Sequence, residues 1–233
     1  MTDQVQFTSS VTVELVKTDF SDTIPVVAAR TSTAGAEASS KVTKGLINAL
    51  MRDRHGSPFE HMTATWLVTA PIFVWREHHR HRIASYSEES GRYRQLRPIF
   101  YLPSGDRLVT QVGKPMDYDL REGPEELKKE IQERQAAVCA VAYRNYEELL
   151  EKGVAREVAR NTLPLNIMSS CMVTMNSRGL MNFLSLRHES EDSKYETHPL
   201  HEIDLVAQGY ERTFKEYAPL THEAFVKFGR VAP

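Results

Sequence analysis

Side chains that could bind charged ligands are densest between Arg76 and Pro98, where 23 residues include six arginines, three histidines and three glutamates. A solvated helix face usually mixes lysine with arginine, but this stretch contains no lysine. A guanidinium group is planar and always charged, so it can bind a phosphate or a carboxylate through two hydrogen bonds. Three serine hydroxyls and Gly91 add small donors and a backbone that a phosphate can approach closely. The stretch therefore predicts an anion-binding pocket.

Three other interpretations of this stretch are open. A surface charge run is the commonest origin of such a patch, but the apolar residues 69–75 just before it are expected to be buried and to carry the arginines inward. A metal site at His78, His79 and His81 is disfavoured, because adjacent residues on a helix point about 100° apart. A nucleic-acid surface would need basic residues well beyond one loop.

The order of these residues resembles a known family. Arg80-His81-Arg82, seven further residues and then Ser90-Gly91-Arg92 are similar to the signature of the flavin-dependent thymidylate synthases, the ThyX family. The segments 55–61 and 174–187 are similar to two further segments of that family, in the same order along the chain. Glutamine is more usual in the family at the position of Glu77, and the segment 188–202 departs from the family's shorter polar link.

The resemblance divides the side chains between two ligands. The residues it implies in binding the flavin cofactor, FAD, are Ser57, Arg80, His81, Arg82, Glu88, Asn176, Ser177, Arg178 and Asn182. The residues it implies in binding the nucleotide, dUMP, are Glu77, Arg80, Glu88, Glu89, Ser90, Gly91, Arg92, Arg160 and Arg187, with Arg160 supplied by a neighbouring subunit. His55 is implied on the folate side of the flavin, and Ser32 matches a family serine near the flavin. No metal is implied.

Arg187 is the implied catalytic residue, because a family arginine at this position polarises the pyrimidine. A fixed cation beside developing negative charge is a general means of catalysis. Arg178 and Asn182 are four residues apart and share a helix face, whereas Arg187 lies nine residues beyond Arg178 and points about 180° away. One helix could therefore serve two ligands. Ser90 is interpreted as a binding residue, because its neighbours are glutamates and an arginine rather than an oriented base.

The resemblance implies a homotetramer with shared active sites that methylates dUMP reductively to dTMP. Methylenetetrahydrofolate would give the carbon, and NADPH would reduce the FAD. Two alternatives from other classes stay open. A nucleotide-binding regulatory protein would bind dUMP but purify without flavin, and an RNA-binding protein would use residues 76–97 as its surface, with an affinity that falls steeply with salt.

Composition favours one domain over residues 1–233, since 41% of the residues are hydrophobic and no linker is evident. The net charge of −2 gives the chain no general attraction to nucleic acid or to an anionic membrane. Cys139 and Cys171 are expected to be buried free thiols. No run approaches the ~20 apolar residues of a membrane span and no signal peptide is evident, so a cytoplasmic location is expected.

The resemblance implies a mixed α/β domain with a central sheet flanked by helices, and hydrophobic periodicity indicates where its strands and helices lie. Strands are expected at 11–16, 62–74, 98–103 and 171–175, with Pro71 placing the second at a sheet edge or a bulge. Asn176 is expected to cap a helix that carries Arg178 and Arg187. Further helices are expected at 40–54, 124–152, 155–163, 200–218 and 221–228, and residues 113–123 are expected to be polar and exposed.

Overall fold

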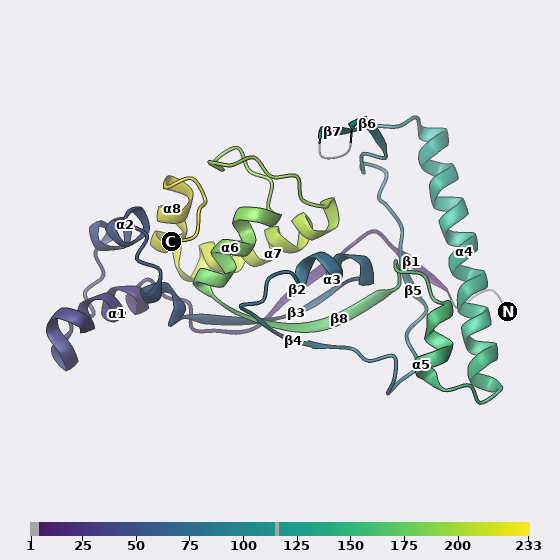
Figure 1. The fold of residues 1–233 in the computed structure, drawn as a ribbon, viewed down its shortest axis with the longest axis horizontal. Helices are drawn as coiled ribbons and strands as arrows, with labels where there is room; N and C mark the ends of the chain where they lie inside the picture. Colours follow the sequence, from purple (N-terminus) through teal and green to yellow (C-terminus); the bar gives the residue numbers. More distant parts are fainter. Residues whose placement is uncertain (1–4, 115–116) are drawn as a thin grey trace. The chain divides into compact units, whose positions relative to one another are not determined.

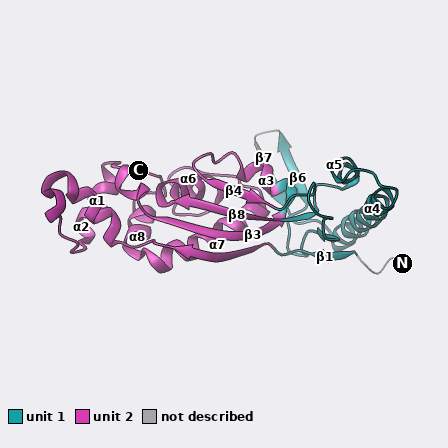
Figure 2. Ribbon diagram, turned by 90° about the horizontal axis from the view of Figure 1, so that it is seen from below, with its two compact units in different colours: residues 1–10, 71–73, 89–169 teal, residues 11–70, 74–88, 170–233 magenta. Residues whose placement is uncertain are grey.

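The structure, a computed structural model, describes residues 5–114 and 117–233 of the chain. The chain folds into two compact units, which are coloured separately in Figure 2. Unit 1 comprises residues 1–10, 71–73 and 89–169, and unit 2 comprises residues 11–70, 74–88 and 170–233. Each unit is assembled from stretches that are separated in the sequence. The single domain expected over residues 1–233 stays a prediction.

The secondary structure is mixed α/β, as predicted. The strands are β1 (Gln6–Thr8), β2 (Thr12–Thr18), β3 (Thr63–Pro71), β4 (Ser85–Glu88), β5 (Ile99–Tyr101), β6 (Thr110–Lys114), β7 (Asp117–Arg121) and β8 (Met168–Asn176). The helices are α1 (Thr23–Ala34), α2 (Lys44–Arg52), α3 (Ile72–His78), α4 (Glu125–Glu151), α5 (Arg156–Ala159), α6 (Ser177–Arg187), α7 (His201–Tyr217) and α8 (Pro219–Lys227). Short 3-10 turns lie at η1 (Gly35–Glu37), η2 (Ser57–Glu60) and η3 (Arg160–Thr162).

Unit 2 is built on a four-stranded sheet of order β2-β3-β8-β4, and Figure 1 shows α3, α6 and α7 over one face of it. Trp66 of β3 is fully buried, and its ring lies 4.6 Å from that of Tyr210 on α7, with the two planes tilted by 50°. Its Nε1 donates to the hydroxyl of Thr213, also on α7. A Cβ at Gly209 would lie 2.5 Å from the Cβ of Val13, so glycine lets α7 approach β2 closely. Burial of these large aromatic surfaces stabilises the face that carries α6.

Unit 1 is organised around the long helix α4, which packs on the short parallel pair β1-β5. Its core includes Phe100, Tyr143 and Tyr146. The hydroxyl of Tyr146 accepts from the backbone N–H of Leu96 at 3.2 Å, and that of Tyr143 donates to the Leu96 carbonyl at 2.9 Å. Two buried tyrosines therefore hold the second half of the arginine-rich stretch against α4.

The sequence expectation for the strand at 62–74 is wrong in two respects. The strand expected to reach Val74 ends at Pro71, and helix α3 begins at Ile72. Proline has no N–H to donate to the hydrogen-bond ladder of a sheet, but it is compatible with the start of a helix, so Pro71 ends the strand. It does not mark a sheet edge, because β3 is an inner strand. Residues 113–123 were expected to be exposed, and those whose burial the structure describes are exposed apart from Gly123; part of the antiparallel hairpin β6-β7, which was not predicted, lies in this segment.

The expectations for the two cysteines and for Asn176 are confirmed. Cys139 and Cys171 are both buried and free, and burial raises the pKa of the Cys171 thiol to about 11. The Asn176 side chain caps α6 by accepting from the N–H of Gly179 at 2.8 Å. Within residues 5–114 and 117–233, no helix combines the length and hydropathy needed to cross a membrane.

Candidate functional site

A cavity of about 550 Å³ lies in unit 2, within the size range of ligand sites. It is lined by residues from the arginine-rich stretch, from the first half of α6, from the end of α2 and η2, and from the last residues of the sequence. These residues are Arg54, Glu60, Arg80, His81, Arg82, Ile83, Asn176, Arg178, Gly179, Asn182, Ala232 and Pro233. Six of the nine residues predicted to bind FAD line this one cavity: Arg80, His81, Arg82, Asn176, Arg178 and Asn182.

The electrostatics of the cavity favour an anion. Four arginines and a single glutamate line it, so the charged lining is strongly positive. Asn176 places the first turn of α6 at the wall, and the N-terminus of a helix carries partial positive charge. A Cβ at Gly179 would lie 2.9 Å from the carbonyl oxygen of Ile83, so glycine is needed for the loop after α3 to reach this helix end.

Arg178 is held on two sides. Its Nη1 donates to Oε1 of Glu60 at 2.5 Å, and its Nε donates to the main-chain oxygen of Pro233 at 2.7 Å. A Cβ at Gly56 would lie 2.5 Å from the Arg178 Cζ, so the guanidinium occupies space that only glycine leaves open. The side chain is therefore oriented before any ligand arrives.

Arg187 lies in a second cluster, as the spacing along α6 predicted. Its Nη1 donates to the Glu77 carboxylate, and its Nε donates to Nε2 of His81 at 3.1 Å. Burial, followed by the charge of Arg187, lowers the pKa of His81 to about 4, so the imidazole is neutral near pH 7 and carries its proton on Nδ1. Because His81 also lines the cavity, it connects Arg187 to the predicted flavin site.

A third group of predicted residues lies in unit 1. The Ser90 hydroxyl accepts from the N–H of Arg92 at 3.2 Å, and Arg92 forms an exposed ion pair with Glu157 at 3.1 Å. Gly91 is buried, and a Cβ there would lie 3.2 Å from the Cδ of Arg160. Glu89 pairs with Arg94 and Arg97 at 3.4 and 3.7 Å. The predicted dUMP residues thus divide between this unit and unit 2, which contains Glu77, Arg80, Glu88 and Arg187.

The remaining predicted residues do not line the cavity. Ser177 is fully buried and donates to the Phe59 carbonyl at 2.5 Å, which ties the start of α6 to η2. Ser57 begins η2 and is exposed, as is His55. Glu88 is the last residue of β4. Ser32 is exposed and donates to the Ala29 carbonyl within α1. Their roles in ligand binding stay predictions.

The cavity also includes residues that the sequence did not single out. Arg54 lies two residues beyond the end of α2 and has a left-handed backbone, with φ of 60°. Its Nη2 donates to the Ala232 carbonyl at 2.9 Å. Glu60 lies in the segment 55–61, which resembles the family, so a place in the cavity could have been predicted for it. The contribution of residues 232–233 had no sequence signal, because it depends on where the last segment folds.

His78 has a structural role. It is completely buried, and its Nε2 and Nδ1 lie 2.9 and 3.3 Å from the hydroxyls of Tyr210 and Tyr86. Burial, with a smaller effect from His81, lowers its pKa to about 3, so it is neutral. Among the residues that the structure describes, no group of three or more His, Cys, Asp or Glu side chains is arranged to hold a metal ion.

Comparison with known proteins identifies the family. The sequence matches the thymidylate synthase complementing protein family over residues 14–220. The flavin-dependent thymidylate synthase of Tropheryma whipplei (strain TW08/27) is 49% identical over 232 residues, which cover 97% of this chain and 97% of that protein. The flavin-dependent thymidylate synthase of Streptomyces coelicolor is 46% identical over 237 residues, which cover 99% of this chain and 96% of that protein. The fold superimposes with a TM-score of 0.93 on the UMP/dUMP methylase PolB of Streptomyces cacaoi bound to 5-Br UMP, 44% identical, covering 99% of this chain and 100% of that one. The chain therefore belongs to the thymidylate synthase complementing protein family, in which its relatives are flavin-dependent thymidylate synthases.

Proposed function

We propose that the chain catalyses the reductive methylation of dUMP to dTMP. Methylenetetrahydrofolate supplies the carbon, which replaces the hydrogen on C5 of the pyrimidine, and NADPH supplies the two electrons that convert a methylene into a methyl group. The products are dTMP, tetrahydrofolate and NADP⁺. The observation that carries the proposal is the convergence of four arginines and the N-terminus of α6 on one cavity, with Arg187 joined to that cavity through His81.

The cavity residues fit FAD by charge and by donor type. Arg80, Arg82 and Arg178 would neutralise its pyrophosphate, and the first turn of α6 offers backbone N–H groups to the same anion. The amides of Asn176 and Asn182 can both donate and accept hydrogen bonds along the cofactor. When bound, the flavin supplies the hydride that completes the methyl group.

The nucleotide would lie against the Arg187 cluster. Arg187 would donate to the pyrimidine carbonyl oxygens and stabilise the negative charge that develops on the ring. Neutral His81 holds the Nε of Arg187 and so fixes the direction of the guanidinium. The Ser90 hydroxyl and the guanidinium groups of Arg92 and Arg160 have the chemistry to bind the phosphate.

We further propose that the chain works as a single domain within a homotetramer whose subunits share active sites. The support for this proposal is the resemblance to a family of homotetramers, in which an arginine at the position of Arg160 reaches the nucleotide from a neighbouring subunit. Light scattering of the purified chain would give its mass against the 26.6 kDa of one subunit.

The proposed function is tested by the visible spectrum of the purified chain with FAD supplied, before and after dUMP. We expect a flavin band that shifts when dUMP is added, because both ligands share a site. Tritium release from dUMP labelled at C5, in the presence of methylenetetrahydrofolate and NADPH, should then report turnover. A chain that binds dUMP but no FAD would be a nucleotide-binding regulator, and salt-sensitive RNA affinity without a dUMP preference would indicate an RNA-binding protein.

The similarity to PolB favours UMP as a second acceptor to test, since that enzyme is a UMP/dUMP methylase. The same assay with UMP labelled at C5 gives the comparison. The relatives that are 46–49% identical are thymidylate synthases, so we expect kcat/KM to be higher for dUMP than for UMP. The opposite order would assign UMP methylation as the main activity.

A further inference from the structure

The last residues of the sequence take part in the cavity described above. Ala232 and Pro233 line it, and their main-chain oxygens accept hydrogen bonds from Arg54 at 2.9 Å and from Arg178 at 2.7 Å. Two of the four cavity arginines are therefore oriented by this segment. A carbonyl such as that of Ala232 is a neutral acceptor, so it fixes the direction of a guanidinium without cancelling its charge.

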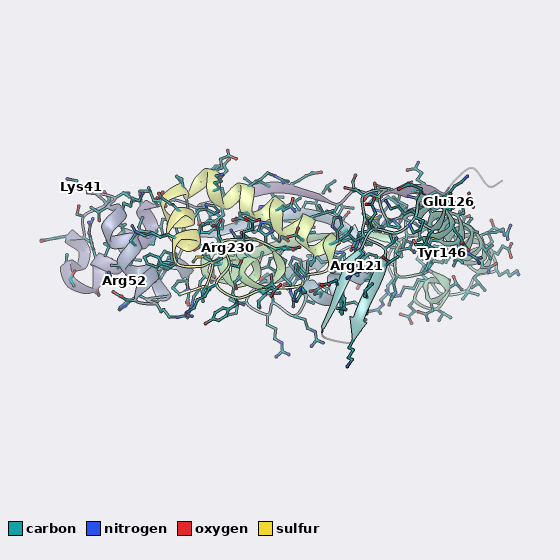
Figure 3. All side chains as sticks on the ribbon, turned by 90° about the horizontal axis from the view of Figure 1, so that it is seen from above. Lys41, Arg52, Arg121, Glu126, Tyr146 and Arg230 are labelled. Carbon is teal, nitrogen blue, oxygen red and sulfur yellow. The ribbon has the colours of Figure 1, made fainter. Side chains whose placement is uncertain are left out.

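The segment is anchored at Arg230, which is 4% exposed. Its guanidinium forms two hydrogen bonds to Glu211 of α7, at 2.7 and 2.9 Å, and lies 5.2 Å from the ring centroid of Phe225 on α8. Figure 3 labels Arg230 beside these helices. Its backbone has φ of 55°, a left-handed conformation that is uncommon outside glycine, and its N–H donates to the Phe225 carbonyl. The buried bidentate pair offsets the strain of this turn.

Space for the other end of the segment comes from Gly56. A Cβ at that position would lie 2.5 Å from the Cζ of Arg178 and 2.7 Å from the main-chain oxygen of Pro233. The absence of a side chain therefore lets the residue before η2, an arginine of α6 and the last residue meet in one place. Three stretches far apart in the sequence depend on one another here.

We propose that residues 230–233 form a positioning wall of the flavin site, which directs Arg54 and Arg178 toward the phosphates of the cofactor. The inference rests on the proposed function, because it takes FAD as the ligand of this cavity. Arg230 anchors this wall through Glu211, and Gly56 leaves room for the wall because it has no side chain. Arg230 lies outside the segments that resemble the family, and Gly56, although it lies within the segment 55–61, was assigned no role from the sequence.

The test is the affinity for FAD, measured by quenching of flavin fluorescence, in the unsubstituted chain and in Arg230→Gln. Without its anchor, the segment would no longer hold the main-chain oxygens of Ala232 and Pro233 against Arg54 and Arg178, and both guanidinium groups would lose their orientation. We therefore expect Kd for FAD to rise about tenfold, which corresponds to the loss of about one charge-assisted hydrogen bond. An unchanged Kd for FAD in Arg230→Gln would overturn the inference. A lower Kd would also overturn it and would show that the segment competes with the cofactor.

Two further variants separate positioning from stability. His222→Ala removes another partner of Glu211, at 2.7 Å, without touching the segment, so its Kd should be unchanged even if its Tm falls. Gly56→Ala disturbs the Arg178–Pro233 contact from the opposite side and should raise Kd while leaving the Arg230–Glu211 pair intact. Equal Kd values for Gly56→Ala and the unsubstituted chain would overturn the inference. If the unsubstituted chain binds no FAD, the proposed function fails and the wall fails with it.

Discussion

At the scale of single residues, the ion pair between Glu77 and Arg187 has the clearest consequence for ligand binding. Both side chains are about three-quarters buried, with 24% and 22% of their surfaces exposed. A partly buried carboxylate neutralises much of the charge that Arg187 could offer to a pyrimidine. A nucleotide that binds Arg187 must therefore compete with Glu77, or share the guanidinium with it.

Replacing Glu77 with glutamine should tighten dUMP binding. The amide oxygen of glutamine can still accept a hydrogen bond from Arg187, but the neutral side chain no longer compensates the guanidinium charge. We therefore expect Kd for dUMP to fall about three- to tenfold, the scale of a net hydrogen bond to a charged group. The shift of the flavin band during a dUMP titration measures this Kd. Glu133→Gln makes the same charge change on an exposed position of α4 and should leave Kd unaltered. Weaker binding by Glu77→Gln would show that the carboxylate itself contacts the nucleotide.

At the scale of elements, α6 divides two tasks along its length. Its first turn and Arg178 face the cavity, whereas Arg187, at its last residue, contacts Glu77 and His81. The helix can hold both arginines in place because its buried side includes Leu180, Phe183 and Leu184, which are fully buried. Packing of that side against the sheet and α7 keeps the two ends at a fixed separation.

Alanine substitutions at the two arginines should therefore separate binding from turnover. Arg178→Ala should raise Kd for FAD about tenfold or more, because a cavity cation and two of its hydrogen bonds are lost. Arg187→Ala should retain FAD and lose turnover by about 10² or more, the scale of removing one electrostatic donor from a transition state. Flavin fluorescence and tritium release measure the two effects on each variant. Full turnover by Arg187→Ala would contradict its assigned role.

For the whole molecule, the widest charged network of the described residues is partly buried and joins the end of α6 to α7, α8 and the last segment. His188 lies 2.5 Å from Asp204 and 3.0 Å from Glu211, and Glu211 also pairs with His222 and Arg230. Burial alone would lower the pKa of His188, but hydrogen bonds to the two carboxylates outweigh it and raise the pKa to about 9. Burial likewise opposes the ionisation of Glu211, but its three hydrogen-bonding partners hold its pKa well below the usual range.

These shifts predict that the stability of the fold is greatest near pH 6.5. Unfolded His188 loses its proton before the folded residue does, so its contribution is complete below about 6.5 and is lost as the pH rises to about 9. Buried His78, whose pKa is lowered to about 3, acts in the opposite direction, because the unfolded state binds its proton first as the pH falls below about 6.5. Calorimetric unfolding from pH 5 to 9 should show Tm falling on both sides.

The variant His188→Gln provides the control for the alkaline side. It keeps a polar side chain at the end of α6 but cannot carry charge, so its Tm should be lower at pH 6.5 and should change less between pH 7 and 9. The decline below pH 6.5, which depends on the lowered pKa values of His78 and His81, should persist. An alkaline decline as steep as that of the unsubstituted chain would assign it to another group.

The family, the helices α2 and α4 to α8, and the strands β2, β3, β5 and β8 could be predicted from the sequence, because motifs and hydrophobic periodicity are properties of continuous segments. The helices α1 and α3 and the short strands β1, β4, β6 and β7 were not predicted. The spacing of nine residues between Arg178 and Arg187 on a helix, and the capping preference of Asn176, are properties of a continuous segment, and both are confirmed. The long helix α4 followed from its sustained apolar periodicity and matches its expected bounds within one residue at each end.

Which of these residues contact one another depends on the tertiary structure, which local patterns do not encode. Pro71 sits at the end of an inner strand, because the neighbours of a strand are set by its pairing and not by its own composition. The contact of Arg54 and Arg178 with residues 232–233 joins positions that are up to 178 residues apart. No local propensity encodes such a contact, since it arises from the packing of α7 and α8 that places Arg230 on Glu211. The motif therefore predicted the ligand, and the fold decided what holds its arginines in place.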